Sequence, residues 1–301
     1  MEPSGVLIIN KQGGMTSHDV VNRIRRLYGT RRVGHTGTLD PLATGVLTVL
    51  VGRAAKAAEY LMADSKEYIA TLRLGLTTDT EDITGNTLTA CEDIPTLDQV
   101  IAAVKSFEGD IEQIPPMYSA LKVDGQKLCD LARKGVSVER APRPVTIFSI
   151  EVSPADTPAD YILRVSCSSG TYIRTLCADI GARLGCGGAM ATLCRWRAGE
   201  FTIENAHTLA ELEQMGEDER ISLLRPVESL FTSLPKVNLS EFFEKLSRSG
   251  CEIYQKKIRT DFAAGERVRL CSAEGKFYAL GEVREYEKGS AIKSIKMFDI
   301  E

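Results

Sequence analysis

The sequence predicts an α+β protein with a second, smaller β domain. Strand-like apolar runs alternate with helices of uneven length, which favours α+β over a doubly wound parallel sheet. After about Pro235 the chain changes to short strand candidates separated by glycine-rich and charged turns, as in a small β-barrel. We therefore expect one domain over residues 1–232 and a second over residues 233–301, and a chain of 301 residues is long enough for both.

The start of the chain shows how the elements are assigned. The apolar run 6–10 predicts a short buried strand. Ser17 is the expected cap of a helix, because Val20 and Ile24 follow it at helical spacing and Gly29 is a typical stop.

The other elements follow from the same patterns of apolar spacing and from caps. In chain order they are strands over 46–51 and 66–74, a helix over 97–107 starting at a Thr96–Gln99 capping box, a basic irregular stretch over 118–143 with a short helix at 127–133, strands over 145–152 and 161–167, a helix over 172–184, a strand over 200–203, a helix over 209–215, and strands over 268–271, 276–283 and 291–298.

The composition is that of an ordinary water-soluble protein, with 43% hydrophobic and 26% charged residues. No window approaches the roughly 18 apolar residues of a membrane span, and the N-terminus lacks the pattern of an export signal. The eight cysteines include no Cys-x-x-Cys pair, so reduced thiols are expected, and three histidines are too few to favour a histidine-based metal site. We expect a cytoplasmic protein.

The charge is distributed unevenly along the chain. The formal net charge is −4, yet residues 11–56 hold eight basic side chains against only Asp19 and Asp40. Such a local basic field can bind phosphates while the whole molecule stays acidic. A solvated helix face is the alternative interpretation of the same residues.

The loop over residues 34–45 is the most informative segment. It holds three glycines and the dipeptide Asp40-Pro41, and it precedes the apolar strand 46–51. A proline biases the residue before it toward an extended or turn conformation, so Asp40 could be presented as a single reactive carboxylate. Many Asp-Pro pairs only start a turn, and the dipeptide alone leaves both interpretations open.

Common catalytic motifs are missing, and four blocks of sequence remain. There is no phosphate-binding Gly-x-x-x-x-Gly-Lys loop, no Gly-x-Ser-x-Gly elbow and no His-Glu-x-x-His helix. The blocks are 11–17 (Lys-Gln-Gly-Gly-Met-Thr-Ser), 34–45, 66–68 with 78–85, and 167–174 with Leu193-Cys194-Arg195 downstream. In these blocks, and in 118–122 and 132–135, the chain resembles the tRNA pseudouridine-55 synthase family, the bacterial TruB family. The resemblance spans most of residues 5–205.

The resemblance implies an isomerase that converts one uridine in the T-loop of tRNA to pseudouridine. It implies the pseudouridine-synthase fold, in which helices flank a central mixed, largely antiparallel sheet, followed by a small PUA-like β-barrel domain. The base leaves the sugar, turns and returns, so neither a metal nor a cofactor is expected. The reaction has glycosidase-like character at C1′, which suits a carboxylate.

The resemblance also assigns residues in the active site. Asp40 matches the catalytic aspartate, which either attacks C1′ or removes a sugar proton. Arg174 matches the arginine that pairs with that aspartate, and Tyr68 matches the tyrosine that stacks on the flipped base. Leu193 matches an apolar wall of the uracil pocket.

RNA-binding residues are carried over in the same way. His35 matches the histidine that fills the space left by flipped bases. Lys11, Arg31, Arg32, Lys56 and Tyr172 are expected to bind the RNA, together with a basic insertion over about 116–144 that closes on it. Two positions depart from the family pattern: Gln12 stands where proline is usual, and Ala55 where threonine is common.

The expected partner is tRNA, through its T-arm and elbow, with no membrane, no guide RNA and a monomeric enzyme. A tRNA-folding binding module is one rival, although a pure binder has no chemical need for Asp40, Tyr68 and Arg174. A guide-RNA-dependent pseudouridylase is another, and the bacterial-like C-terminal segment argues against it.

Overall fold

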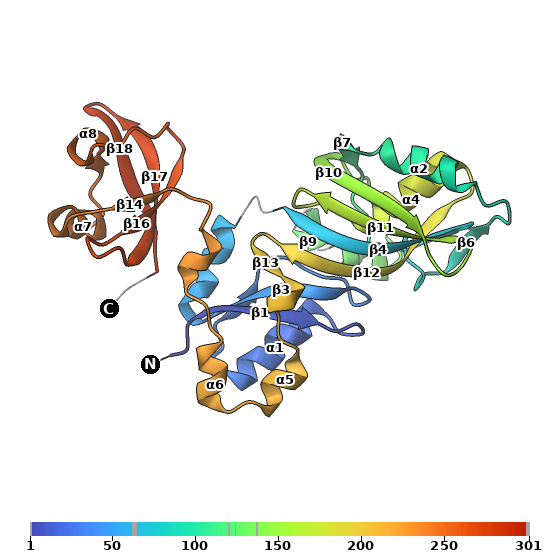
Figure 1. Cartoon of the computed structure of the whole chain (residues 1–301), viewed down its shortest axis with the longest axis horizontal. Coiled ribbons are helices and arrows are strands. Elements are labelled where there is room, and N and C mark those ends of the chain that lie inside the picture. The colour runs from blue at the N-terminus through green and yellow to red at the C-terminus, as the bar shows by residue number, and fades with distance from the viewer. Residues whose placement is uncertain (1, 62–64, 120, 124, 137, 299–301) are drawn as a thin grey trace.

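The computed structural model describes residues 2–61, 65–119, 121–123, 125–136 and 138–298 (Figure 1). Ala120, Asp124 and Ser137 of the expected insertion, and the last three residues of the expected second domain, lie outside the described residues. Within the described ranges, no helix is both long and apolar enough to cross a membrane.

One large sheet organises the first two thirds of the chain. Its main strands, in spatial order, are β1 (Gly5–Lys11), β3 (Thr44–Val51), β12 (Gly188–Ala198), β4 (Lys66–Leu74), β11 (Asp160–Cys167), β10 (Arg143–Pro154) and β7 (Gly109–Gln113), with β2 (Val33–His35) beside β3 and β13 (Phe201–Thr202) beside β12. Every pairing is antiparallel except that of β12 with β3. This confirms the expected mixed, largely antiparallel sheet.

Three helices join the sheet through a single apolar cluster. They are α1 (Ser17–Leu27), α2 (Leu97–Lys105) and α4 (Ile173–Leu184). The cluster includes Val20 and Ile24 of α1, Val100 of α2 and Leu176 of α4, all fully buried. Burial of these apolar stripes is what keeps the helices on the sheet, because helices of this length are marginal alone.

The predicted cap of α1 is wrong by one residue. Thr16 is the N-cap: its hydroxyl accepts from the Asp19 N–H, and the Asp19 carboxylate accepts from the Thr16 N–H in return. Ser17 is thereby free for another bond, described below. The prediction also left out β12, the strand that joins β3 to β4 in the middle of the sheet.

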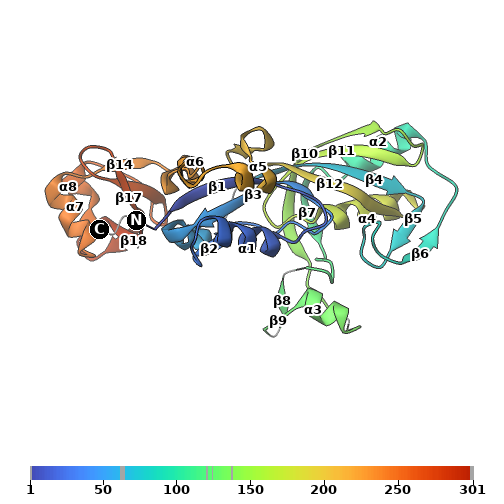
Figure 2. The ribbon, with the colours of Figure 1, turned by 90° about the horizontal axis from the view of Figure 1, so that it is seen from below.

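The remaining elements of this part are short. They are the 3-10 helices η1 (Gly52–Tyr60), η2 (Ile203–Asn205) and η3 (Val227–Leu230), the strands β5 (Leu76–Thr78), β6 (Thr87–Ala90), β8 (Lys122–Val123) and β9 (Gln126–Lys127), and the helices α3 (Leu128–Arg133), α5 (Leu209–Gln214) and α6 (Glu217–Ser222). The short helix expected at 127–133 is confirmed as α3. Figure 2 shows β8, β9 and α3 projecting from the sheet on the side of α1 and β2.

A second, curled sheet forms the C-terminal part, consistent with a PUA-like domain. Its strands, in spatial order, are β14 (Lys236–Asn238), β16 (Arg267–Cys271), β17 (Phe277–Tyr286), β18 (Gly289–Met297) and β15 (Ile253–Tyr254), and it carries α7 (Glu241–Arg248) and α8 (Gln255–Ile258). It has its own buried cluster around Val268 and Tyr278. The division at residue 232 stays a prediction.

The two sheets are joined through apolar and charged contacts. Phe298 and Leu280 share a buried cluster with Val6 and Val46 of the large sheet. Tyr60, at the end of η1, lies between two cations of the C-terminal part: the Arg267 guanidinium and the Lys296 ammonium each lie 5.6 Å from its ring centroid. Its hydroxyl donates to the Ile295 carbonyl (3.3 Å).

Replacement of Tyr60 by Ala is expected to loosen this junction. Two cation–π contacts and one hydrogen bond together contribute about 1–3 kcal/mol. We expect a lower Tm by scanning calorimetry and faster proteolysis between the two parts. Tyr60→Phe keeps the ring and should lie close to wild type; equal losses for Ala and Phe would contradict the role of the ring.

Candidate active site

Asp40 lies on a loop whose main chain is held from both sides. The Ser17 hydroxyl accepts from the Leu39 N–H (2.8 Å) and lies 3.1 Å from the Leu39 carbonyl, to which it can donate. On the other side, the Pro41 carbonyl accepts from the Gly14 N–H (2.9 Å). The residue between Leu39 and Pro41 is therefore fixed by α1 and by the segment that precedes it.

Lys11 holds the same loop from inside the protein. Its side chain is fully buried, and its ammonium donates to the carbonyls of Gln12 (2.9 Å), Met15 (2.8 Å) and Pro41 (3.3 Å). Burial lowers the pKa of Lys11 to about 8. These three bonds give Lys11 a role in holding the loop, and its expected contact with RNA stays a prediction.

A third anchor comes from β12. Arg195 donates from Nε to the Val46 carbonyl (2.7 Å), from Nη2 to Gly37 (3.1 Å) and from Nη1 to Thr38 (3.4 Å). At the start of β3, Gly45 has φ +98°, and a Cβ there would lie 2.3 Å from the Arg195 carbonyl oxygen. Only glycine allows this close approach of β3 to β12.

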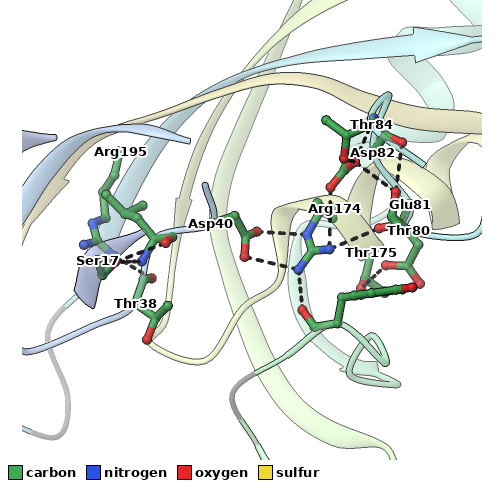
Figure 3. Close-up of polar contacts among 12 residues, drawn as sticks. Ser17, Thr38, Asp40, Thr80, Glu81, Asp82, Thr84, Arg174, Thr175 and Arg195 are labelled. Atoms are coloured by element: carbon green, nitrogen blue, oxygen red, sulfur yellow. Dashed lines mark hydrogen bonds and ion pairs between the residues drawn. The ribbon is translucent and has the colours of Figure 1, made fainter. Parts of the chain in front are cut away.

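Arg174, in the first turn of α4, binds Asp40 with two nitrogens (Figure 3). Its Nε lies 2.9 Å from Asp40 Oδ2, and its Nη2 donates to Oδ1 (3.3 Å). The same guanidinium donates to the carbonyls of Tyr118 (2.8 Å) and Thr80 (3.1 Å). Two-point binding of a carboxylate fixes its orientation as well as its charge.

A second carboxylate lies on the far side of Arg174. Asp82 Oδ2 is 3.6 Å from Arg174 Nη1, and the Asp82 side chain is 8% exposed. The other Asp82 oxygen accepts from the Thr84 N–H (2.9 Å) and from the Thr80 hydroxyl (2.9 Å). Arg174 is thus bound between two acids, which overcomes the unfavourable position of a cation at a helix N-terminus.

The turn that carries Asp82 is fixed by its neighbour. Glu81 has φ +64°, a conformation that is uncommon for residues other than glycine. Its carboxylate accepts from the Thr175 hydroxyl (2.7 Å), and its carbonyl accepts from the Met190 N–H (3.0 Å). These bonds to α4 and β12 hold the turn against the active site.

Burial and Arg174 act on Asp40 in opposite directions. Burial raises the pKa of Asp40 above its ordinary value, and the Arg174 charge opposes that rise. The Asp40 side chain keeps 33% of its surface exposed, whereas Arg174 keeps 5%. A carboxylate paired with a guanidinium and open on one side can reach a bound molecule.

Tyr68 on β4 and Leu193 on β12 lie on one face of the sheet, next to the loop that carries Asp40. In the register of β4 with β12, Leu193 pairs with Ala70 and Arg195 with Tyr68, so the four side chains share one face of the sheet. Tyr68 is 9% exposed and Leu193 7%. Burial raises the pKa of the Tyr68 phenol, so it is neutral at pH 7.

The root of the insertion is bound to the start of α4. The Gln113 amide, 1% exposed, both donates to the Tyr172 carbonyl (3.1 Å) and accepts from its N–H (2.9 Å). Tyr118, five residues further along, supplies the carbonyl that binds Arg174. Tyr172 thus lies two residues before Arg174 and supports it through its main chain.

The other predicted RNA contacts lie near the surface. His35 is half-buried at the end of β2, and burial lowers the pKa of its imidazole. Arg31 and Lys56 are exposed. Arg32 is exposed too, and it pairs with Glu2 (3.3 Å).

The prediction omitted several residues that build the site. Ser17, Gln113 and Arg195 act on main-chain groups far away in sequence, so local pattern did not indicate their roles, although Ser17 and Arg195 lie in the blocks that carry the resemblance. Asp82 belongs to the 78–85 block, and its position in that block was the available signal.

A carboxylate bound by a guanidinium and lying next to a tyrosine ring is suited to chemistry at a sugar carbon. Comparisons with known proteins identify the family of the chain. Residues 25–173 match the model of the TruB family pseudouridylate synthase N-terminal domain, and residues 174–232 match the tRNA pseudouridylate synthase B C-terminal domain.

Curated relatives match nearly the whole chain. The tRNA pseudouridine synthase B of Clostridium novyi (strain NT) is 43% identical over 92% of this chain and 95% of its own. That of Clostridium kluyveri (strain ATCC 8527) is 40% identical over 98% and 99%. A solved Cbf5–Nop10–Gar1 complex contains a chain with TM-score 0.75 and 28% identity, over 98% of this chain and 85% of that one. The protein belongs to the TruB family of pseudouridylate synthases, which are isomerases.

Replacement of Arg174 by Gln is expected to shift the pH profile. We expect the reaction to use ionised Asp40, so that its rate should fall as pH drops through the pKa of Asp40. Loss of the opposing guanidinium lets burial raise that pKa further, by about 1–3 units. Single-turnover rates from about pH 5 to about pH 9 measure the shift. An acid limb that stays in place or moves to lower pH would contradict the role given to Arg174.

Proposed function

We propose that the protein is a tRNA pseudouridine-55 synthase that isomerises one T-loop uridine, with Asp40 acting at the ribose. The observation that carries this proposal is the two-point bond between Arg174 and the half-open carboxylate of Asp40. The curated relatives carry the name of this activity over nearly their whole length.

The chemistry follows from the charge of Asp40. Its carboxylate either attacks C1′ or removes a sugar proton, and both routes need it ionised. The C1′–N1 bond breaks, the base turns, C5 bonds to C1′, and a proton passes from C5 to N1. The net composition is unchanged, so the reaction needs no co-reactant.

Tyr68 and Leu193 would hold the base during its rotation. A neutral phenol offers a flat apolar ring for stacking, and the raised pKa of Tyr68 keeps it protonated at pH 7 in the free enzyme, so that it holds no free base to accept a proton. We therefore propose stacking and orientation as its main task. Leu193, on the neighbouring strand β12, would form an apolar wall of the pocket that holds the base.

The RNA would lie along the face that carries α1 and β2, with the insertion closing from one side (Figure 2). The target base must leave its stack, which costs a few kcal/mol, and His35 would fill the space left behind. Arg31, Arg32 and Lys56 would bind phosphates of the T-arm, and residues 233–301 would extend the contact. We propose a cytoplasmic monomer that uses no guide RNA.

The reaction itself is tested by release of tritium from C5 of uridine in an unmodified tRNA. Wild type is expected to release label, and Asp40→Asn is expected to release none above background. Asp93→Asn, an exposed carboxylate in a loop, is the matched control and should match wild type. No release by wild type would refute the proposed activity, and release by Asp40→Asn would refute the role of Asp40.

The stability of Asp40→Asn serves as its folding control. A folded-state pKa above the ordinary value means that the folded protein binds more protons than the unfolded chain just above pH 3.8, so ionised Asp40 lowers stability at neutral pH. Asp40→Asn should therefore unfold at a Tm no lower than that of wild type.

Phosphate binding is tested by salt dependence. Affinity for tRNA is expected to fall with rising salt, with a slope that decreases by about 1 for each phosphate contact removed. Arg31→Ala and Lys56→Ala should each reduce the slope, while Arg23→Ala, whose guanidinium already pairs with Glu213 (2.7 Å), should change it less. Unchanged slopes for Arg31→Ala and Lys56→Ala would contradict these contacts.

A further inference from the structure

Arg195 is a buried cation that donates to three main-chain carbonyls and also lies at the Tyr68 hydroxyl. It is 3% exposed, and its acceptors are the carbonyls of Gly37, Thr38 and Val46. Within the described part of the chain, no carboxylate lies at ion-pair distance from it. A buried charge without an opposite partner is costly to the fold, so its presence calls for another reason.

Two other buried or half-buried arginines of this region, Arg174 and Arg197, pair with carboxylates. Arg174 lies between two carboxylates, Asp40 and Asp82. Arg197, two residues beyond Arg195 on β12, pairs with Glu67 (2.7 Å). Of these three, Arg195 alone keeps a charge that no acid balances.

The position of Arg195 puts this charge at the base pocket. Arg195 faces Tyr68 across β12 and β4, and its other side meets the loop that carries Asp40. The pKa of Tyr68 is raised by burial and lowered in part by Arg195, and that of His35 is lowered by burial and then by Arg195. The positive field therefore reaches Tyr68, which we propose stacks on the base, and His35, which we propose fills the space that the base leaves.

The proposed reaction creates a negative charge in that pocket. When the C1′–N1 bond breaks, its electron pair leaves with the base, and the detached uracil is an anion. This holds whether Asp40 attacks C1′ or takes a sugar proton. The anion disappears only when C5 donates a pair to C1′, after which a proton moves from C5 to N1.

We infer that Arg195 is a positioning residue that fixes the loop of Asp40 and supplies the positive field that stabilises the uracil anion. This inference rests on the proposed function. Stabilisation by a preorganised charge acts where charge develops, and a buried guanidinium held by three carbonyls needs no rearrangement when the bond breaks. Two of these bonds, to the Gly37 and Thr38 carbonyls, hold the main chain just before Asp40 in place for either route.

The first test compares variants at two neighbouring arginines. Arg195→Met is expected to lower the single-turnover rate on uridine tRNA by about 100-fold, with the dissociation constant of tRNA changed by less than about threefold. Arg195→Lys keeps the charge and should recover about tenfold of that loss. Arg197→Met, the matched control on the same strand, should stay within about threefold of wild type. A loss in binding with an unchanged rate would overturn the inference.

The second test separates the two effects of Arg195: its positive field on the uracil anion and its hold on the loop of Asp40. In tRNA with 5-fluorouridine at the target, fluorine withdraws electrons and makes the base anion more stable. The rate is read as loss of the target nucleoside after digestion, because fluorine blocks proton release from C5. Arg195→Met should then lose about tenfold or less, compared with about 100-fold on uridine.

Each outcome has one meaning. Equal losses on the two substrates would overturn the proposed field and leave Arg195 a holder of the loop. If Arg195→Met does not fold by calorimetry, the same comparison is made between Arg195→Lys and wild type, with a smaller loss on 5-fluorouridine as the supporting result. If wild type converts neither substrate, the proposed function itself fails, and the inference fails with it.

Discussion

The ion pair between Arg174 and Asp40 is the interaction on which the rest of the site depends. The Arg174 guanidinium is buried, so the surrounding chain must supply its acceptors and still leave Asp40 open on one side. It binds Asp40 in front, Asp82 behind, and the Tyr118 and Thr80 carbonyls at the sides. These acceptors come from three segments of the chain: the loop of Asp40, the 78–85 turn and the root of the insertion. Packing of the large sheet, the 78–85 turn and the insertion root around one guanidinium therefore sets the charge and the direction of the carboxylate that we propose acts on the ribose.

The loop of Asp40 shows how the fold makes a short segment rigid. Ser17 binds Leu39, Lys11 binds Pro41, and Arg195 binds Gly37 and Thr38, so the main chain is fixed on both sides of the carboxylate. Two of these anchors are buried cations on carbonyl oxygens. Preorganisation of this kind places the carboxylate before the substrate arrives, so that binding does not have to order it.

The sequence predicted elements with strong periodicity and missed contacts that depend on tertiary structure. The apolar runs of β1, β3 and β4 and the helical spacing of α1 and α4 were sufficient for those elements. β12 was missed because its first half consists largely of small residues, among them Gly188, Ala189 and Ala191. Such residues do not give the alternation of apolar and polar side chains by which a strand is recognised. The burial of Lys11 and Arg195 could not be predicted from residue type, because charged side chains are rarely buried. Most of the carbonyls that accept from them also lie in other parts of the sequence. The cap of α1 could have been found, because Thr16 stands three residues before Asp19.

The most direct measurement of the central claim is the titration of Asp40 itself. Carbon-13 labelling of aspartate carboxyls allows its signal to be assigned by its loss in Asp40→Asn and followed with pH in the free enzyme. We expect a pKa above the ordinary 3.8 for Asp40 in wild type, because burial outweighs the Arg174 charge, and a further rise in Arg174→Gln. A pKa at or below 3.8 in wild type, or the same value in both proteins, would contradict it.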